Sequence, residues 1–161
     1  MALTTETKYI ATEIPTKIDL ASVNQILKNT LLLFSAQTGT VHFFNRQDKH
    51  LYLAAATGGL PENVMAVIRK IPSGKGIAGQ AVATKKPVTT CNLQKSEGTT
   101  FAQPQAKATG VSGALCVPIF NGDIAVGTLG VGWTKERDIS QVEIDSLINE
   151  GLKIGKHFAE A

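Results

Sequence analysis

The sequence predicts one α+β domain, an α/β sandwich in which helices pack against an antiparallel sheet. Three observations support this fold class: apolar residues recur at helical spacing near both ends of the chain, shorter apolar runs lie between them, and an Asn-Gly pair separates the two longest of those runs. The chain has 161 residues, of which 43% are hydrophobic. That composition is enough for one core of useful size.

The chain divides into a short arm and a single domain. We expect residues 1–17 to form a flexible polar arm and residues 18–161 to form the domain. The arm has no apolar run of the kind found in a signal peptide. The longest apolar block, Leu31–Phe34, is far too short to cross a bilayer. We therefore expect a cytoplasmic protein with no membrane partner.

Three helices are predicted from periodicity and capping signals. The first begins at Asp19 or Ser22, because Ser22 followed by Gln25 fits a capping box, and it ends at residues 37–39. A second begins at Pro61, which suits the first turn of a helix. The last opens at Ser140, three residues before a glutamate in a second capping box, and runs to about residue 158.

The predicted strands and the segments between them follow from turn residues and apolar runs. Asn121-Gly122-Asp123 separates two apolar runs and predicts a hairpin. A glycine-rich turn at residues 71–80 leads into a short helix, and residues 93–110 form a long polar stretch. The predicted elements are strands at Thr40–Asn45, Leu51–Ala56, Val88–Asn92, Val111–Phe120 and Ile124–Trp133, and short helices at Ile77–Thr84 and near Ala102–Lys107.

Several blocks, in order, resemble the GAF domain family. They are the run from Ile71 to Gly79 followed by Lys86-Pro87-Val88, then Ala114–Ile119, then Val126–Val131, and the closing helix after Asp138-Ile139-Ser140. The resemblance extends over roughly Ile18 to Ala159. It implies a six-stranded antiparallel sheet with helices on one face and a ligand pocket on the other. It also implies terminal helices that pack together and often dimerise.

The glycine-rich turn also satisfies a nucleotide-binding pattern. Residues 74–79 read Gly-x-Gly-x-x-Gly, which exposes backbone N–H groups at a helix start and suits a phosphate. A dinucleotide site, however, needs a buried parallel strand before the turn, and Ile71-Pro72 makes a poor central strand. We therefore interpret the motif as a tight turn that lets the short helix pack on the sheet.

Charge and cysteine content exclude several classes of function. The net charge is +3, and the basic residues occur in pairs without a long stripe, so we expect no nucleic-acid partner. The two cysteines, Cys91 and Cys116, and three histidines have no zinc-site spacing, so we expect no metal and no cofactor. His42 is either a ligand or haem contact or, as we favour, an ordinary surface or core histidine.

Four residues are the candidate ligand contacts, in a pocket between the sheet and the 93–110 loop. They are Cys91, Phe101, Thr109 and Trp133. Cys91 stands at the end of a predicted strand, where it is either a redox-sensing or ligand-lining thiol or an inert apolar filler. Trp133 either caps the pocket mouth or packs under the final helix.

A stripe on the last helix suggests a dimer interface. Two glycines four residues apart permit close helix approach, and apolar residues share their side. The alternative is close packing on the domain's own sheet or first helix. The family habit favours the dimer, and the predicted seam consists of Leu147, Gly151, Ile154, Gly155 and Phe158.

Three functions remain open. The leading hypothesis is a non-enzymatic sensor that binds an unidentified small molecule and signals through a homodimer or a partner protein, with no catalytic residue. The second is a thiol enzyme similar to the GAF proteins that reduce free methionine-(R)-sulfoxide. Those proteins carry a cysteine where this chain has Ala78, and another in the loop that here spans Ser96–Gly110, which has none. The third is a dimeric interaction module without a ligand.

Overall fold

A computed structural model describes residues 14–90 and 110–158 of the chain, and one six-stranded sheet organises them. The strand order is β3-β2-β1-β6-β5-β4, and every neighbouring pair is antiparallel. The elements are α1 (Leu20–Phe34), β1 (Thr38–Asn45), β2 (His50–Thr57), α2 (Glu62–Ile68), β3 (Lys70–Pro72), α3 (Gly76–Thr84), β4 (Val88–Thr90), β5 (Gly113–Asn121), β6 (Ile124–Trp133) and α5 (Gln141–Phe158). The predicted fold class is confirmed.

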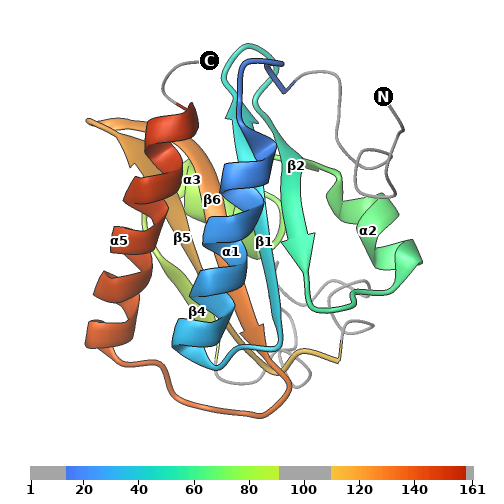
Figure 1. Ribbon diagram of the computed structural model, residues 1–161, viewed down its shortest axis with the longest axis vertical. Coiled ribbons are helices and arrows are strands. Elements are labelled where there is room, and N and C mark those ends of the chain that lie inside the picture. Colours follow the sequence, from blue (N-terminus) through green and yellow to red (C-terminus); the bar gives the residue numbers. More distant parts are fainter. Residues whose placement is uncertain (1–13, 91–109, 159–161) are drawn as a thin grey trace.

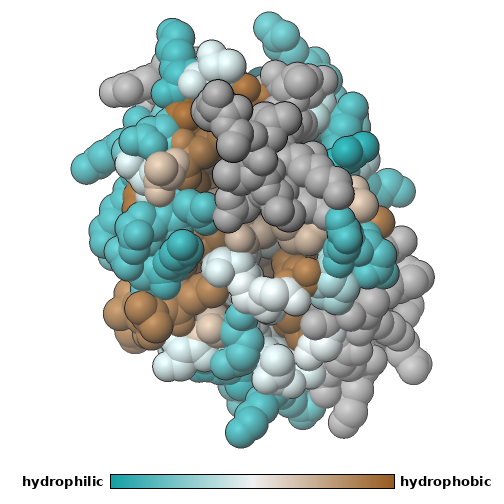
Figure 2. Space-filling view, turned by 45° about the vertical axis from the view of Figure 1, so that its right-hand side comes forward, coloured by the Kyte–Doolittle hydropathy of each residue, from teal (hydrophilic) through white to brown (hydrophobic). Residues whose placement is uncertain are grey.

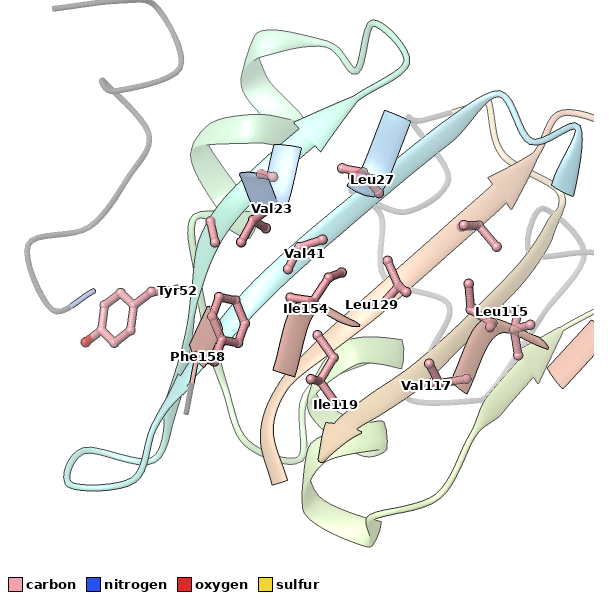
Figure 3. Close-up of a cluster of buried hydrophobic side chains, with 14 of the residues drawn as sticks. Val23, Leu27, Val41, Tyr52, Leu115, Val117, Ile119, Leu129, Ile154 and Phe158 are labelled. Atoms are coloured by element: carbon pink, nitrogen blue, oxygen red, sulfur yellow. The ribbon is translucent and has the colours of Figure 1, made fainter. Parts of the chain in front are cut away.

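The helices lie on both sides of the sheet. Helices α1 and α5 run side by side across one face, while α3 lies behind the sheet and α2 beside it (Figure 1). The face under α1 and α5 is filled by a dense apolar core. Figure 3 shows this core, where Leu27 of α1 and Ile154 of α5 project toward Val41, Leu115 and Leu129 of the strands. All five side chains are fully buried.

Local signals explain most of the element boundaries. The capping box at the last helix is confirmed, because Glu143 N–H donates to Ser140 Oγ and Ser140 N–H donates to the Glu143 carboxylate. Helix α1 starts from Asp19, the first of the two predicted positions, but without the predicted capping box of Ser22 and Gln25. Asp19 is its N-cap and accepts from the Ser22 N–H, so Ser22 lies inside the first turn and does not cap the helix.

The predicted hairpin is present, and the sheet holds one further strand. Asn121 pairs with Ile124, and Gly122 has a positive φ of 63°, as the tight turn requires. The additional strand is β3, which contains Pro72. A proline is tolerated there because β3 is at the edge of the sheet, where one side of the strand needs no hydrogen-bond partner.

The packed part of the chain begins earlier than the boundary at residue 18. Ile14 is buried in the same core as Val23 and Leu27, ahead of the predicted end of the arm. Residues 14–17 therefore belong to the folded domain. The predicted helix near Ala102–Lys107 lies outside the described residues. Within residues 14–90 and 110–158, no helix is both long and apolar enough to span a bilayer.

Candidate functional site: a cavity on the open face of the sheet

A cavity of about 330 Å³ lies on the face of the sheet opposite α1 and α5. Strands β1, β5 and β6 form its floor, and α2, β3 and the first turn of α3 form its walls. Most of the lining side chains are apolar, with a few hydroxyl, imidazole and ammonium groups among them. The lining residues are Thr38, Gly39, Thr40, His42, Leu60, Val64, Val67, Ile68, Lys70, Ile71, Pro72, Lys75, Gly76, Ile77, Ala78, Val111, Ala114, Leu115, Cys116, Gly130, Val131 and Gly132.

Along β6, at the floor of the cavity, small residues alternate with large ones. Side chains on a strand point to opposite faces in turn. Gly130 and Gly132 stand on the cavity side, between residues whose side chains enter the helix-side core. A Cβ at Gly132 would come within 2.8 Å of the Thr38 hydroxyl oxygen, and one at Gly130 would lie 3.4 Å from the Thr40 hydroxyl oxygen. Gly132 therefore makes room for the side chains of Thr38 and Val111, whereas Gly130 leaves the space above it without a side chain.

His42 is the most deeply buried polar residue in the cavity wall, with 2% of its surface exposed. Its Nε2 lies 2.9 Å from the Ile68 carbonyl oxygen. A carbonyl only accepts hydrogen bonds, so Nε2 carries the hydrogen. Burial lowers the pKa of His42 to about 4, although the bond to Ile68 opposes that shift. The imidazole is therefore neutral at physiological pH.

The second ring nitrogen of His42 is an unused acceptor. In the neutral tautomer with hydrogen on Nε2, the Nδ1 atom holds a free lone pair. It is buried and has no hydrogen-bond partner among the described residues. A buried polar atom without a partner costs free energy, and this one has almost no surface accessible from the cavity. A register shift between β1 and β2 falls at Val41/His42, beside the cavity.

The first turn of α3 brings positive potential to the cavity wall. Gly76, Ile77 and Ala78 line the cavity, and the preceding Lys75 gives the helix no side-chain cap. The free N–H groups of a helix start and its dipole both attract anions. The described lining contains two lysines and no aspartate or glutamate. Lys70 and Lys75 are both exposed, and the Lys70 ammonium lies over the Tyr52 ring, 5.6 Å from the centroid.

Cys116 lines the cavity but is a poor nucleophile. It is 3% exposed, and burial raises the pKa of its thiol to about 12, although the Thr128 hydroxyl favours the thiolate. The thiolate is the reactive form of cysteine. Cys116 is therefore an apolar part of the wall.

The prediction that Trp133 lines the pocket is wrong. Its indole N–H donates to the Phe34 carbonyl at 2.9 Å, and its ring lies in the core beneath α1. The Arg137 guanidinium stacks on the ring, 4.2 Å from its centroid. The physical reason is strand alternation, because Gly132 faces the cavity and the next residue must face the helices. The other three predicted contacts, Cys91, Phe101 and Thr109, lie outside the described residues.

The predicted dimer interface is also wrong, because its residues do not lie on the surface. All five residues, Leu147, Gly151, Ile154, Gly155 and Phe158, are buried against the protein's own sheet. A Cβ at Gly155 would approach the Phe120 carbonyl oxygen to 2.6 Å, and one at Gly151 would lie 3.5 Å from Ile119. The glycines let α5 approach β5 closely. The structure thus has the alternative arrangement, in which the last helix packs on the domain's own sheet.

The glycine-rich turn before α3 also serves packing, as the sequence indicated. Gly74 and Gly76 have positive φ angles of 92° and 64°. A Cβ at Gly79 would come within 2.7 Å of the Pro72 carbonyl oxygen. The Gly74 N–H donates to the Gly79 carbonyl at 2.9 Å and closes the turn. The motif thus places the first turn of α3 at the cavity wall.

Sequence reasoning missed the polar stripe of β1. Thr38, Thr40 and His42 alternate along the strand and all line the cavity. The signal was present as hydroxyl and imidazole side chains at every second position, opposite the glycines of β6. Among the described residues, no cluster of three histidine, cysteine, aspartate or glutamate side chains could hold a metal ion.

The fold and the cavity together define a class of small α+β regulatory domains that bind small molecules. Within that class, residues 18–149 match the sequence model of the GAF domain. The chain therefore belongs to the GAF domain family. Comparison with curated proteins finds no match to this chain.

Solved structures with this fold come from regulatory proteins and from enzymes. The GAF domain of an Acinetobacter phosphoenolpyruvate-protein phosphotransferase has a TM-score of 0.73 at 17% identity, over 92% of this chain and 87% of that one. The free methionine-R-sulfoxide reductase of Neisseria meningitidis, solved with its substrate, gives 0.69 at 17%, over 87% and 77%. The second GAF domain of DevS from Mycobacterium smegmatis gives 0.65 at 19%, over 88% and 94%. At these identities the likeness concerns the fold.

Proposed function

We propose that this chain binds a small molecule in the cavity and acts as a non-enzymatic sensory domain. The observation that carries the proposal is the cavity itself, with about 330 Å³ of space on the sheet face that α1 and α5 leave uncovered. A mainly apolar cavity of this size with a few polar groups is typical of small-molecule sites. A glycine inside a strand costs stability, and a binding cavity gives a reason for Gly130, which leaves its part of the floor without a side chain.

The proposal includes an output through a second copy of this chain. The apolar side chains that remain exposed on the terminal helices support a contact surface there: Leu32 is 82% exposed and Leu33 65% on α1, and Val142 is 75% exposed on α5. Figure 2 shows apolar patches at the surface between hydrophilic side chains. We expect light scattering to give the mass of a dimer, and Leu32→Glu with Leu33→Glu to give a monomer. A monomeric wild-type chain would contradict this part of the proposal, and output would then need a different signalling protein.

The alternative of a methionine-sulfoxide reductase is favoured by the likeness to the Neisseria enzyme. Two observations oppose it. Cys116 is buried with a raised pKa, and Ala78 lines the cavity where the resembling reductases carry a cysteine. The assay is consumption of free methionine-(R)-sulfoxide with a thiol reductant. Turnover that is abolished in Cys91→Ser would overturn the non-enzymatic proposal, and no turnover is the expected result.

A ligand screen tests the sensor proposal directly. A molecule that binds only the native state raises the melting temperature, so nucleotides, amino acids and small organic anions are screened by thermal shift. The matched variants are Gly130→Leu, whose side chain extends into the cavity, and Gly130→Ala, whose Cβ makes ordinary contacts with Thr40 and Cys116 at 3.4 and 3.7 Å. The expected hits stabilise the wild type and the alanine variant but not the leucine variant. If no compound stabilises the wild type, the ligand-free interaction module is favoured.

A further inference from the structure

The open part of the cavity floor lies above Gly130, between a hydroxyl and a thiol. Strands β1, β6 and β5 are neighbours in the sheet (Figure 1), and Gly130 pairs with Thr40 on one side and with Cys116 on the other. A Cβ at Gly130 would lie 3.4 Å from the Thr40 hydroxyl oxygen and 3.7 Å from the Cys116 sulfur. Both distances are ordinary contacts, so a ligand group the size of a methyl fits between the two side chains.

The Thr40 hydroxyl is a hydrogen-bonding group that a ligand can reach at this place. No described residue bonds to it, and it is not among the buried polar atoms with almost no accessible surface, as His42 Nδ1 and Thr128 Oγ1 are. A hydroxyl both donates and accepts, so it suits either kind of ligand group. The Cys116 thiol behaves as a small apolar group. A ligand above Gly130 thus meets a hydroxyl on one side and an apolar sulfur on the other.

The described lining offers no partner to an ion at the floor. Strands β1, β5 and β6 bring no charged side chain to it, and no carboxylate lies elsewhere in the described lining. The Lys70 ammonium lies over the ring of Tyr52, which belongs to the core on the opposite face of the sheet. Lys75 attracts an anion at the wall, but it is exposed, and water and salt screen it there. An ion taken down to the floor would lose its hydration without gaining a counter-ion.

The volume of the cavity sets the size of its ligand. A cavity of roughly 150 Å³ holds one benzene ring, and this one has about 330 Å³. Gly130 also lets a flat ring approach the backbone closely. We propose, on the basis of the sensor function above, that the cavity binds an uncharged, mainly apolar molecule about the size of a fused two-ring aromatic. The molecule lies over Gly130, and one N–H, O–H or carbonyl group of it bonds to the Thr40 hydroxyl.

A pair of two-ring probes tests the charge of the ligand. Indole-3-carboxamide and indole-3-carboxylate share the same outline, and only the second is charged at neutral pH. Calorimetric titration is expected to show that the carboxamide binds at least about tenfold more tightly, because the carboxylate loses its hydration at the floor. Equal or tighter binding of the carboxylate would overturn the uncharged class and would favour the wall beside Lys75 as the place of binding.

A second pair of probes and two variants test the hydrogen bond to Thr40. Indene has the outline of indole with a methylene group in place of the N–H. Thr40→Val replaces the hydroxyl with a methyl group, so the ratio of indole affinity to indene affinity is expected to fall about fivefold. The ratio cancels the difference in hydrophobicity between the probes. Thr89→Val, at a strand threonine outside the described lining, is the matched control and is expected to leave the ratio unchanged. An unchanged ratio in Thr40→Val would overturn the contact with Thr40.

A nuclear Overhauser measurement on the wild type keeps the test valid if Thr40→Val does not fold. Contacts are expected between the ring protons of indole and both the Thr40 methyl group and the Gly130 α-protons. Contacts with Lys75 and Gly76 alone would overturn the inference. If neither indole nor its carboxamide binds while other compounds stabilise the wild type but not Gly130→Leu, the inference fails and the sensor function stands. If no compound binds, the sensor function itself fails.

Discussion

The two faces of the sheet share the same three central strands but differ in the side chains that cover them. On the helix side, β6 places Leu129, Val131 and Trp133 in the core beneath α1 and α5. On the cavity side, the same strand has Gly130 and Gly132. Large side chains fill the first face, whereas on the second face Gly130 leaves space and Gly132 makes room for Thr38 and Val111. One strand can thus supply stability and a site at once, because alternate residues serve different faces.

Removing volume from each face should affect the stability of the protein very differently. Leu129→Ala is expected to cost about 3 kcal/mol of unfolding free energy, because the fully buried side chain leaves a hole that α1 and α5 cannot close. Thr40→Ala, on the hollow face, is expected to cost less than about 1 kcal/mol. Urea denaturation measures both. Equal losses would mean that the cavity face is as tightly packed as the helix face.

The second test adds volume to the helix side. Gly155→Ala is expected to destabilise the protein by about 2 kcal/mol, because its Cβ would meet the Phe120 carbonyl oxygen at 2.6 Å and push α5 away from β5. Gly151→Ala is the control on the same helix. Its Cβ meets Ile119 at an ordinary 3.5 Å, so the gain in helix propensity is expected to stabilise by up to about 1 kcal/mol. The comparison is wrong if both variants behave alike.

The third test measures how protonation of His42, which is buried beside the cavity, changes stability with pH. The pKa of His42 is about 4 in the folded protein and 6.5 as its ordinary value, so between these pH values the unfolded chain binds more protons than the native one. Stability contributed by the neutral ring is complete above about pH 6.5 and is lost as the pH falls toward 4. From pH 7 to pH 4.5 the wild type is expected to lose about 2 kcal/mol more than His42→Gln. Denaturation curves at the two pH values give this difference, and parallel losses would mean that His42 is accessible to protons in the native state.

The smallest expected effect is that of Trp133→Phe, which tests whether Trp133 lies on the helix side of the sheet. Trp133→Phe removes the N–H that donates to the Phe34 carbonyl at 2.9 Å, which is expected to cost about 1 kcal/mol of stability. Ligand affinity is expected to stay unchanged, because the ring lies beneath α1. A calorimetric titration of any hit from the screen checks this. A fall in affinity with no loss of stability would return Trp133 to the binding site.

The fold could be predicted from the sequence wherever the signals are local. The hairpin at Asn121-Gly122 and the capping box of Ser140 and Glu143 depend only on neighbouring residues, and both are present. The short edge strand β3 was missed. Pairing of three residues around Pro72 is decided by the position of β2, which is a tertiary fact that no local pattern carries.

The candidate site was harder to predict, because it depends on which face each strand residue occupies. A shift of one residue moves a side chain from the cavity to the core, and this is the error made for Trp133. The glycines of α5 were assigned to a dimer for a related reason. A close-packing stripe has the same sequence whether its partner is another chain or the protein's own β5. The sequence left the place of His42 open, and its burial and its bond to the Ile68 carbonyl depend on the packing of α2 against β1.

The most direct test of the central claim is to map where a small molecule binds. Amide resonances of the protein are followed while it is titrated with a compound selected by the thermal-shift screen. The account predicts shifts at residues that line the cavity, such as Thr40, Ile77 and Gly130, with little change at Leu27 of α1 or Ile154 of α5. Shifts confined to α1 and α5, with the cavity residues unmoved, would contradict it.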